Sequence, residues 1–121
     1  MRPTIGPYLI GGLFIVAGAA HFIWPTAYER IVPDYLPMHR ALVVASGAFE
    51  ILGGIAATYP ATRGLAGWGL IMLLLAVFPA NVHMATHAAS FADVAPAWLL
   101  YARLPLQFVL IAWAYRVLAR R

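Results

Sequence analysis

The sequence contains no cysteine and no lysine, and only four of its 121 residues are acidic. Without cysteine, the chain by itself cannot form a disulfide, bind a metal through thiolates or ligate an iron–sulfur cluster. Charged residues make up 10% of the chain, whereas soluble domains contain about 25%. Hydrophobic residues account for 64%, and the mean hydropathy is +0.83. We therefore predict an integral membrane protein with a single domain covering residues 1–121.

The charge that is present is mostly positive. Eight arginines against four acids give a net charge of +4 and an isoelectric point of about 10.0, a balance that also occurs in nucleic-acid-binding domains. Most of the arginines flank apolar runs instead of gathering on one polar face, as positive residues do in membrane proteins. We expect the lipid bilayer to be a partner of this chain, and nucleic acid not to be one.

Four apolar runs are long enough to cross the hydrocarbon core of a bilayer as helices, which takes about 20 residues. The runs cover about residues 7–24, 41–59, 64–86 and 97–118. Because short connections join them, the predicted fold is all-α, a transmembrane up-and-down four-helix bundle. The one sizeable connection before the second run contains Thr26 and Glu29 at capping-box spacing, which predicts a short interfacial helix there.

The arginines in the short connections predict the orientation of the bundle. The side that carries both termini has Arg2, Arg63, Arg116, Arg120 and Arg121. The opposite side has Arg30 and Arg40. Since positive residues are enriched on the cytoplasmic side, we expect both termini to lie in the cytoplasm.

Small residues recur in the first three runs and predict close helix contact. The glycines concerned are Gly11, Gly12, Gly18, Gly47, Gly53, Gly54, Gly64, Gly67 and Gly69. In membranes, such residues let helices approach closely and gain dispersion contacts. The alternative is that they leave room for a flat lipophilic ligand.

Glu50 interrupts the run LVVASGAFEILGG, where no other charge occurs from Ala41 to Thr62. Counted at the helical rise, it lies roughly 14 Å below the outer surface, and Arg103 lies roughly 9 Å below it. An ionisable residue at the centre of the bilayer costs about 2.5–3.5 kcal/mol on insertion scales. We therefore expect Glu50 and Arg103 to form an ion pair between the second and fourth spans, with a protonated Glu50 as the alternative. Such a pair could mark a functional site or only fix helix packing.

Other polar residues fall in the same half of the bundle and complete a predicted polar cluster with Glu50 and Arg103. They are Gln107, Asn81, His21 and His83. Pro79 and Pro105 lie inside two spans beside these residues, so we expect them to kink the helices and widen the bundle into a cavity. The two histidines also raise a metal or haem interpretation. We expect no metal, because no single span carries an HxxxH pair.

Several fragments, in a fixed order, resemble the DoxX-like family of small four-span bacterial membrane proteins. The chain contains HFIWPTAYERIVPDYLP, then SGAFEILGG, then FPANVHMA and finally ARLPLQ. The resemblance covers nearly the whole chain and includes His21, Phe22, Pro25, Tyr28, Pro33, Pro37, Gly47, Glu50, Gly54, Pro79, Asn81, Arg103, Pro105 and Gln107. It implies a protein of the bacterial inner membrane.

The resemblance also implies a connection with redox chemistry. Some relatives are associated with a thiosulfate:quinone oxidoreductase, and others partner oxidative-stress or thiol-handling enzymes. Cysteine-dependent chemistry cannot be transferred to this chain, which has no cysteine. We expect no cofactor held within the chain, quinone as the candidate ligand, and a redox enzyme or a second copy of the chain as candidate partners.

Three functions remain open from the sequence. The first is a redox-associated subunit that binds quinone or another lipophilic molecule at the polar cluster. The second is a non-enzymatic scaffold or anchor for a partner enzyme, in which the cluster only fixes packing. The third is a pathway for protons or a small solute. No residue pattern identifies a catalytic group, so enzymatic activity is left open.

Overall fold

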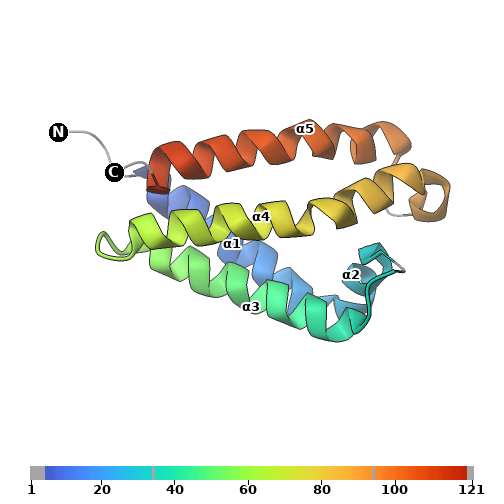
Figure 1. Ribbon diagram of the computed structural model, residues 1–121, viewed down its shortest axis with the longest axis horizontal. Helices are drawn as coiled ribbons and strands as arrows, with labels where there is room; N and C mark the ends of the chain where they lie inside the picture. Colours follow the sequence, from blue (N-terminus) through green and yellow to red (C-terminus); the bar gives the residue numbers. More distant parts are fainter. Residues whose placement is uncertain (1–4, 34, 94, 120–121) are drawn as a thin grey trace.

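The computed structural model describes residues 5–33, 35–93 and 95–119, and helices make up nearly all of this part of the chain (Figure 1). The α-helices are α1 (Ile5–Ile23), α2 (Pro25–Ile31), α3 (His39–Thr58), α4 (Arg63–Thr86) and α5 (Ala97–Ala114). A 3-10 helix, η1 (Ala88–Phe91), follows α4, and a π-helix, η2 (Tyr115–Ala119), extends α5. The predicted all-α helical bundle is confirmed, since the described residues contain no strand.

Four of these helices are long and apolar enough to span a membrane: α1, α3, α4, and α5 together with η2. Their mean hydropathies lie between 1.4 and 2.0. The predicted span edges agree with the helix ends to within about two residues because apolar length is a local property of the sequence. The chain is therefore built as a multi-pass membrane protein. Arg2, Arg120 and Arg121, which entered the orientation prediction, lie outside the described residues.

The helices form two antiparallel pairs, α1 with α3 and α4 with α5 (Figure 1). α4 also packs on α3 and on η2, and it therefore joins the two pairs. The start of α1, the turn between α3 and α4, and η2 lie at one end of the bundle, which we call the terminal end. α2 and η1 lie at the other, which we call the α2 end.

The closest helix contact runs between glycines of α1 and α3, and we call it the glycine seam. A Cβ atom added at Gly11 would lie 2.6 Å from the carbonyl oxygen of Gly54, and one at Gly18 would lie 2.6 Å from that of Gly47. The predicted packing role is confirmed for these four residues. It is wrong for Gly12 and Gly69, because a Cβ at either position would meet no atom within 4 Å.

Apolar side chains fill the two ends of the bundle separately. At the terminal end, the cluster centres on Ile10, Leu70, Ala114 and Leu118, all at most 1% exposed. A second, smaller cluster at the α2 end contains Met84, Phe91 and Leu100. Four polar residues of the spans, Glu50, Asn81, Arg103 and Gln107, lie between the two clusters.

Arg63, which the sequence places in a short connection, opens α4 and is only 4% exposed. Its Nε donates to the carbonyl oxygen of Ala57 at 2.9 Å, and its Nη2 donates to that of Thr58 at 3.0 Å. These carbonyls belong to the last turn of α3, where no intrahelical donor remains. Arg63 thus satisfies the end of one helix from the start of the next.

α2 forms where the sequence predicts a short helix, but the predicted capping box is wrong. Trp24 is its N-cap residue, with no side-chain hydrogen bond at the cap, and Pro25 occupies the first turn. Proline suits that position because its fixed φ matches a helix and no N–H is needed there. The Glu29 carboxylate instead accepts a hydrogen bond from Arg40 at the start of α3.

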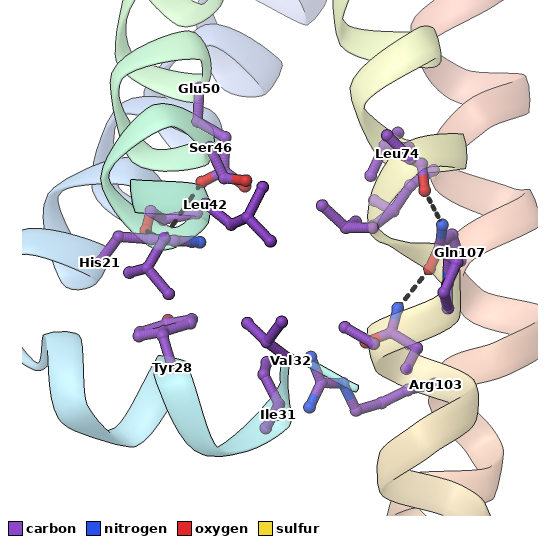
Figure 2. A pocket seen from close by; sticks show the side chains of 18 of the residues that line it. His21, Tyr28, Ile31, Val32, Leu42, Ser46, Glu50, Leu74, Arg103 and Gln107 are labelled. Carbon is purple, nitrogen blue, oxygen red and sulfur yellow. Dashed lines mark hydrogen bonds and ion pairs between the residues drawn. The ribbon is translucent and has the colours of Figure 1, made fainter. Parts of the chain in front are cut away.

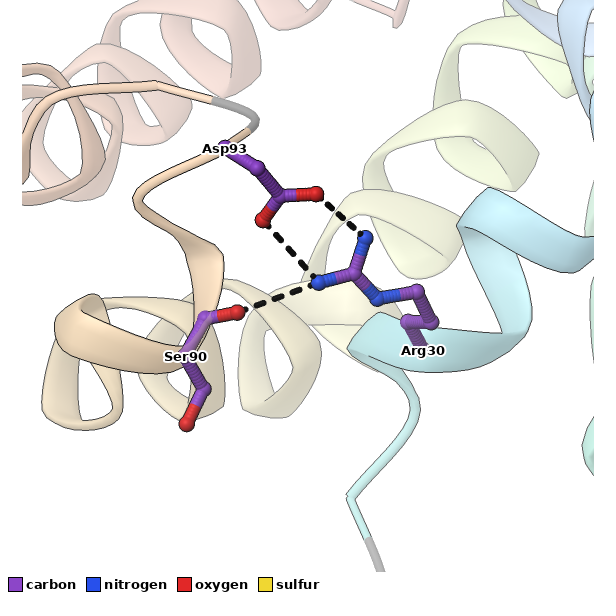
Figure 3. A network of polar contacts seen from close by, with 3 residues as sticks. All are labelled: Arg30, Ser90 and Asp93. Carbon is purple, nitrogen blue, oxygen red and sulfur yellow. Dashed lines mark hydrogen bonds and ion pairs between the residues drawn. The ribbon is translucent and has the colours of Figure 1, made fainter.

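Three residues fasten α2 to the segment after α4, and we call them the Arg30 clamp (Figure 3). The Arg30 guanidinium donates to both carboxylate oxygens of Asp93, at 3.0 and 3.2 Å, and to the carbonyl oxygen of Ser90 at 3.0 Å. The hydrogen bond from Arg30 holds the pKa of Asp93 below its usual range, and the same bond raises the pKa of Arg30. The clamp therefore links two connections that are 60 residues apart in the sequence.

Candidate functional site

A cavity of about 400 Å³ lies in the middle of the bundle. Residues of α1, α2, α3, α4 and α5 all line it. Most of its wall is apolar, with side chains such as Phe14, Val43 and Leu74. The volume falls within the range of about 300–1,000 Å³ that is typical of small-molecule sites. The cavity is therefore large enough for the polar head of an amphipathic molecule and part of an apolar tail.

Glu50 faces this cavity from α3, on the side that we call the acid wall (Figure 2). The residue is 8% exposed, and its Oε2 atom is buried without a hydrogen-bond partner. His21 Nδ1 lies 3.6 Å from that oxygen, which is too far for a hydrogen bond. The same nitrogen is 2.8 Å from the carbonyl oxygen of Ala17, to which it donates. Glu50 therefore lines the cavity with a carboxylate that receives no hydrogen bond from the described residues, and its Oε2 atom lies buried beside His21.

Tyr28 of α2 completes the acid wall by stacking on His21. The ring centroids are 4.0 Å apart and the planes differ by 19°. Burial raises the pKa of the Tyr28 hydroxyl, and the charge of Glu50 raises it further, whereas Arg103 lowers it. The phenol thus stays protonated at neutral pH. Reasoning from residues alone did not select Tyr28, and its spacing of seven residues from His21 across a helix break gave little signal.

Arg103 faces the cavity from α5, on the opposite side from Glu50 (Figure 2). Its Nη1 contacts only the sulfur of Met84, at 3.5 Å. The predicted ion pair between Glu50 and Arg103 is wrong, since no such pair occurs in the part of the chain that the structure describes. Similar depth did not bring the two together. α3 packs with α1 and α5 packs with α4, so the cavity separates the two side chains.

Gln107 and Asn81 do meet, as the predicted polar cluster requires, but they bond to each other and not to Glu50. Gln107 is 3% exposed. Its Nε2 donates to the carbonyl oxygen of Leu74, and its Oε1 accepts from Asn81 Nδ2. Both partners belong to α4 and flank Pro79, which also lines the cavity. Gln107 therefore fastens α5 to α4 around the proline.

The remaining predicted site residues lie away from the cavity. His83 packs against the ring of His87 at 4.4 Å and that of Phe91 at 6.0 Å, and it does not line the cavity. Pro105 lies inside α5 on its exposed face. Of the predicted cluster, the structure brings Glu50 and His21 together on one wall, with Arg103, Asn81 and Gln107 on the other. Within the described residues, no three His, Asp or Glu side chains gather as metal ligands.

Comparison with curated proteins and with solved structures finds no match. A family model does match the chain, over residues 10–118, and these residues include all four span helices except the first turn and a half of α1 and the last residue of η2. Every cavity residue discussed above falls within them. The chain thus belongs to the family described as Domain of unknown function (DUF8561).

Proposed function

We propose that this protein binds a lipophilic molecule with a polar head, for which a quinone-type ring, in its carbonyl or its hydroxylated form, is the candidate, in the cavity between its two helix pairs. The observation that carries the proposal is the Glu50 carboxylate, which lines a cavity of about 400 Å³ and receives no hydrogen bond from the residues that the structure describes. A buried acceptor without a donor costs about 1–3 kcal/mol. A bound molecule that supplies the donor recovers this free energy.

The route into the cavity supports a ligand from the bilayer. Leu13 of α1 and Leu106 of α5 both line the cavity, and they are also 46% and 51% exposed. In a membrane, exposed side chains in the spans face lipid. A molecule dissolved in the bilayer can therefore reach the polar residues by passing between α1 and α5, without crossing the Arg30 clamp at the α2 end.

The wider setting belongs to the same proposal. The resemblance to the DoxX-like family and the arginine distribution support a bacterial inner membrane protein with cytoplasmic termini. In that setting, a redox enzyme is the proposed partner, and it supplies any electron carrier that the reaction needs. A second copy of the chain is a further candidate partner.

A copurification experiment tests the proposal. The protein is isolated in mild detergent and extracted with organic solvent, and the extract is analysed by mass spectrometry against an extract of the same membranes. We expect a lipophile with a polar ring to be enriched at about one molecule per chain. Leu106→Trp should reduce its recovery by about tenfold because the larger side chain fills the entrance.

Val109→Trp is the matched control, since Val109 is 60% exposed on the same helix and does not line the cavity. It should leave the recovery unchanged. Enrichment of bulk lipid only, or equal recovery in both variants, would contradict the proposal.

A scaffold function is the second candidate, and the bonding of Gln107 favours it. Both ends of that amide are satisfied inside the protein, by Leu74 and Asn81. A group that is fully bonded in this way fixes how α4 and α5 pack without needing a ligand. The Glu50 oxygen has no such internal partner, and for that reason we place ligand binding first.

A further inference from the structure

We propose that the cavity selects a head group with a hydrogen-bond donor at one end and an acceptor at the other. This inference rests on the proposed function and names the class of ligand: an amphiphile whose ring carries hydroxyl groups, in preference to the same ring with only carbonyl or ether oxygens. It follows from the hydrogen-bonding capacity left unused on each side of the cavity.

The acid wall offers acceptors. In its ionised form the Glu50 carboxylate can only accept hydrogen bonds, and it accepts none from the described residues. His21 Nδ1 lies 2.8 Å from the Ala17 carbonyl oxygen, which cannot donate, so this nitrogen carries the hydrogen. Tyr28 and Ser46 also line this side of the cavity, and their hydroxyls can donate as well as accept, so the Glu50 carboxylate is the group on this wall that requires a donor from the ligand.

The opposite wall offers a donor. The Arg103 guanidinium has five N–H groups and no acceptor. The structure gives it one side-chain partner, the sulfur of Met84 at 3.5 Å, and a thioether is a weak acceptor. The nearby amides of Gln107 and Asn81 do not compete for it because they bond to each other. Arg103 therefore requires an oxygen acceptor from the ligand.

A hydroquinone ring meets both requirements, because each hydroxyl can donate as well as accept. A quinone ring presents two carbonyl oxygens, so it can bond to Arg103 and leaves the carboxylate of Glu50 without a donor. The site thus favours the hydroxylated form over the carbonyl form. The preference for the hydroxylated form concerns binding alone and requires no transfer of electrons in the cavity.

A pair of ligands that do not differ in tail or ring tests the inference. The probes are decylhydroquinone, kept reduced, and its dimethyl ether, which retains both oxygen acceptors and lacks both donors. Their dissociation constants are measured on the full chain in lipid nanodiscs. We expect the hydroquinone to bind about tenfold more tightly, since a hydrogen bond to a charged acceptor is lost with the ether.

Glu50→Gln should reduce the ratio of the two dissociation constants, ether to hydroquinone, from about tenfold to about twofold. The reason is that a glutamine amide can donate to an ether oxygen as well as accept from a hydroxyl. Glu29→Gln is the matched control: it makes the same change on α2, where Glu29 bonds to Arg40 and does not line the cavity. It should keep the wild-type ratio.

Equal binding of the two probes to the wild-type protein would overturn the inference and leave the proposed function standing. An unchanged ratio in folded Glu50→Gln protein would also overturn it. Failure of both probes to bind would overturn the proposed function itself, and the inference with it. The wild-type comparison decides the inference even where the Glu50 variant does not fold.

Discussion

Glu50 and Gln107 show two ways in which a polar side chain is held inside an apolar bundle. Gln107 is bonded at both ends of its amide, to Leu74 and to Asn81, so each of its two polar atoms has a partner inside the protein. Glu50 is almost as deeply buried and has an oxygen with no donor. Native proteins keep few such groups. The difference between these two residues is the reason that the proposed ligand site is placed at the acid wall.

A double-mutant cycle checks that Glu50 and Arg103 act separately. Because no direct contact joins them, the effects of Glu50→Leu and Arg103→Leu on the free energy of unfolding should add to within about 0.5 kcal/mol. The measurement is unfolding of each variant by denaturing detergent, followed by circular dichroism. Glu50→Leu alone should be neutral or stabilising, since it removes a buried acceptor without a partner. A coupling of more than about 1 kcal/mol would mean that the ion pair forms after all.

The helices depend on close contact more than on polar bonds, and the glycine seam between α1 and α3 is the clearest case. At Gly18, an added Cβ would lie 2.6 Å from the Gly47 carbonyl oxygen and 2.7 Å from a side-chain carbon of Ile51. The backbone oxygen cannot move aside without separating the helices. The acid wall is built on this seam, since His21 belongs to α1 and Glu50 to α3.

Gly18→Ala should therefore destabilise the protein by about 1–3 kcal/mol, the usual cost of overpacking. Gly12→Ala on the same helix is the control, because nothing lies within 4 Å of a Cβ there and alanine is the better helix former. Detergent-induced unfolding of the two variants measures the difference. Equal stability of the two would show that α1 and α3 are not held by the seam.

The Arg30 clamp predicts a dependence on pH at the α2 end. The pKa of Asp93 is lowered in the folded protein from its ordinary value of 3.8. A group with a depressed pKa stabilises the fold above its unfolded pKa and loses that effect as the pH falls through the folded one. The clamp should therefore contribute fully at pH 5–7, and its contribution should fade below about pH 3.8.

Asp93→Asn tests whether the contribution of the clamp to stability falls as the pH is lowered. The variant should melt at a lower temperature than the wild type at pH 7, and the two melting curves should converge below about pH 3.8. The shift should be small because both side chains are exposed and water screens the pair. A gap that widens on acidification would contradict the proposed direction.

The sequence predicted the helices well and their lateral arrangement poorly, for a physical reason. Span length and the place of α2 are local properties, readable from the apolar runs and from the segment that begins at Thr26, although the capping box expected there does not form. Depth within a span is local too, which is why Glu50 and Arg103 were placed at similar levels. Which walls they occupy depends on how α1 pairs with α3 and α4 with α5, and nothing in the composition encodes that pairing. Arg63 was missed for the same reason, since its partners lie at the end of another helix.

At the scale of the whole molecule, two tight helix pairs joined through α4 leave an interior that the side chains do not fill. Apolar clusters close the bundle at the terminal end and at the α2 end. The cavity between them has one charged wall of each sign. This arrangement fits a protein that holds a molecule in the membrane more closely than it fits a channel, which would need an opening at both ends.

The orientation of the bundle can be tested directly because the chain has no native cysteine. Ala61 lies exposed in the turn between α3 and α4, and Ala89 lies exposed in η1 at the opposite end. With cytoplasmic termini, a membrane-impermeant maleimide should label Ala89→Cys in spheroplasts and should label Ala61→Cys only after permeabilisation. The reverse pattern would place the termini outside the cytoplasm.

Leu13 and Leu106 line the cavity and are also exposed on the outside of the bundle, so the cavity borders on lipid and not on water. A cavity bordered by lipid exchanges its contents with a two-dimensional solvent, whose composition is counted in mole fraction and not in molarity. Diluting the cells in water would leave its occupancy unchanged. Altering the mixture of amphiphiles within the bilayer would change it.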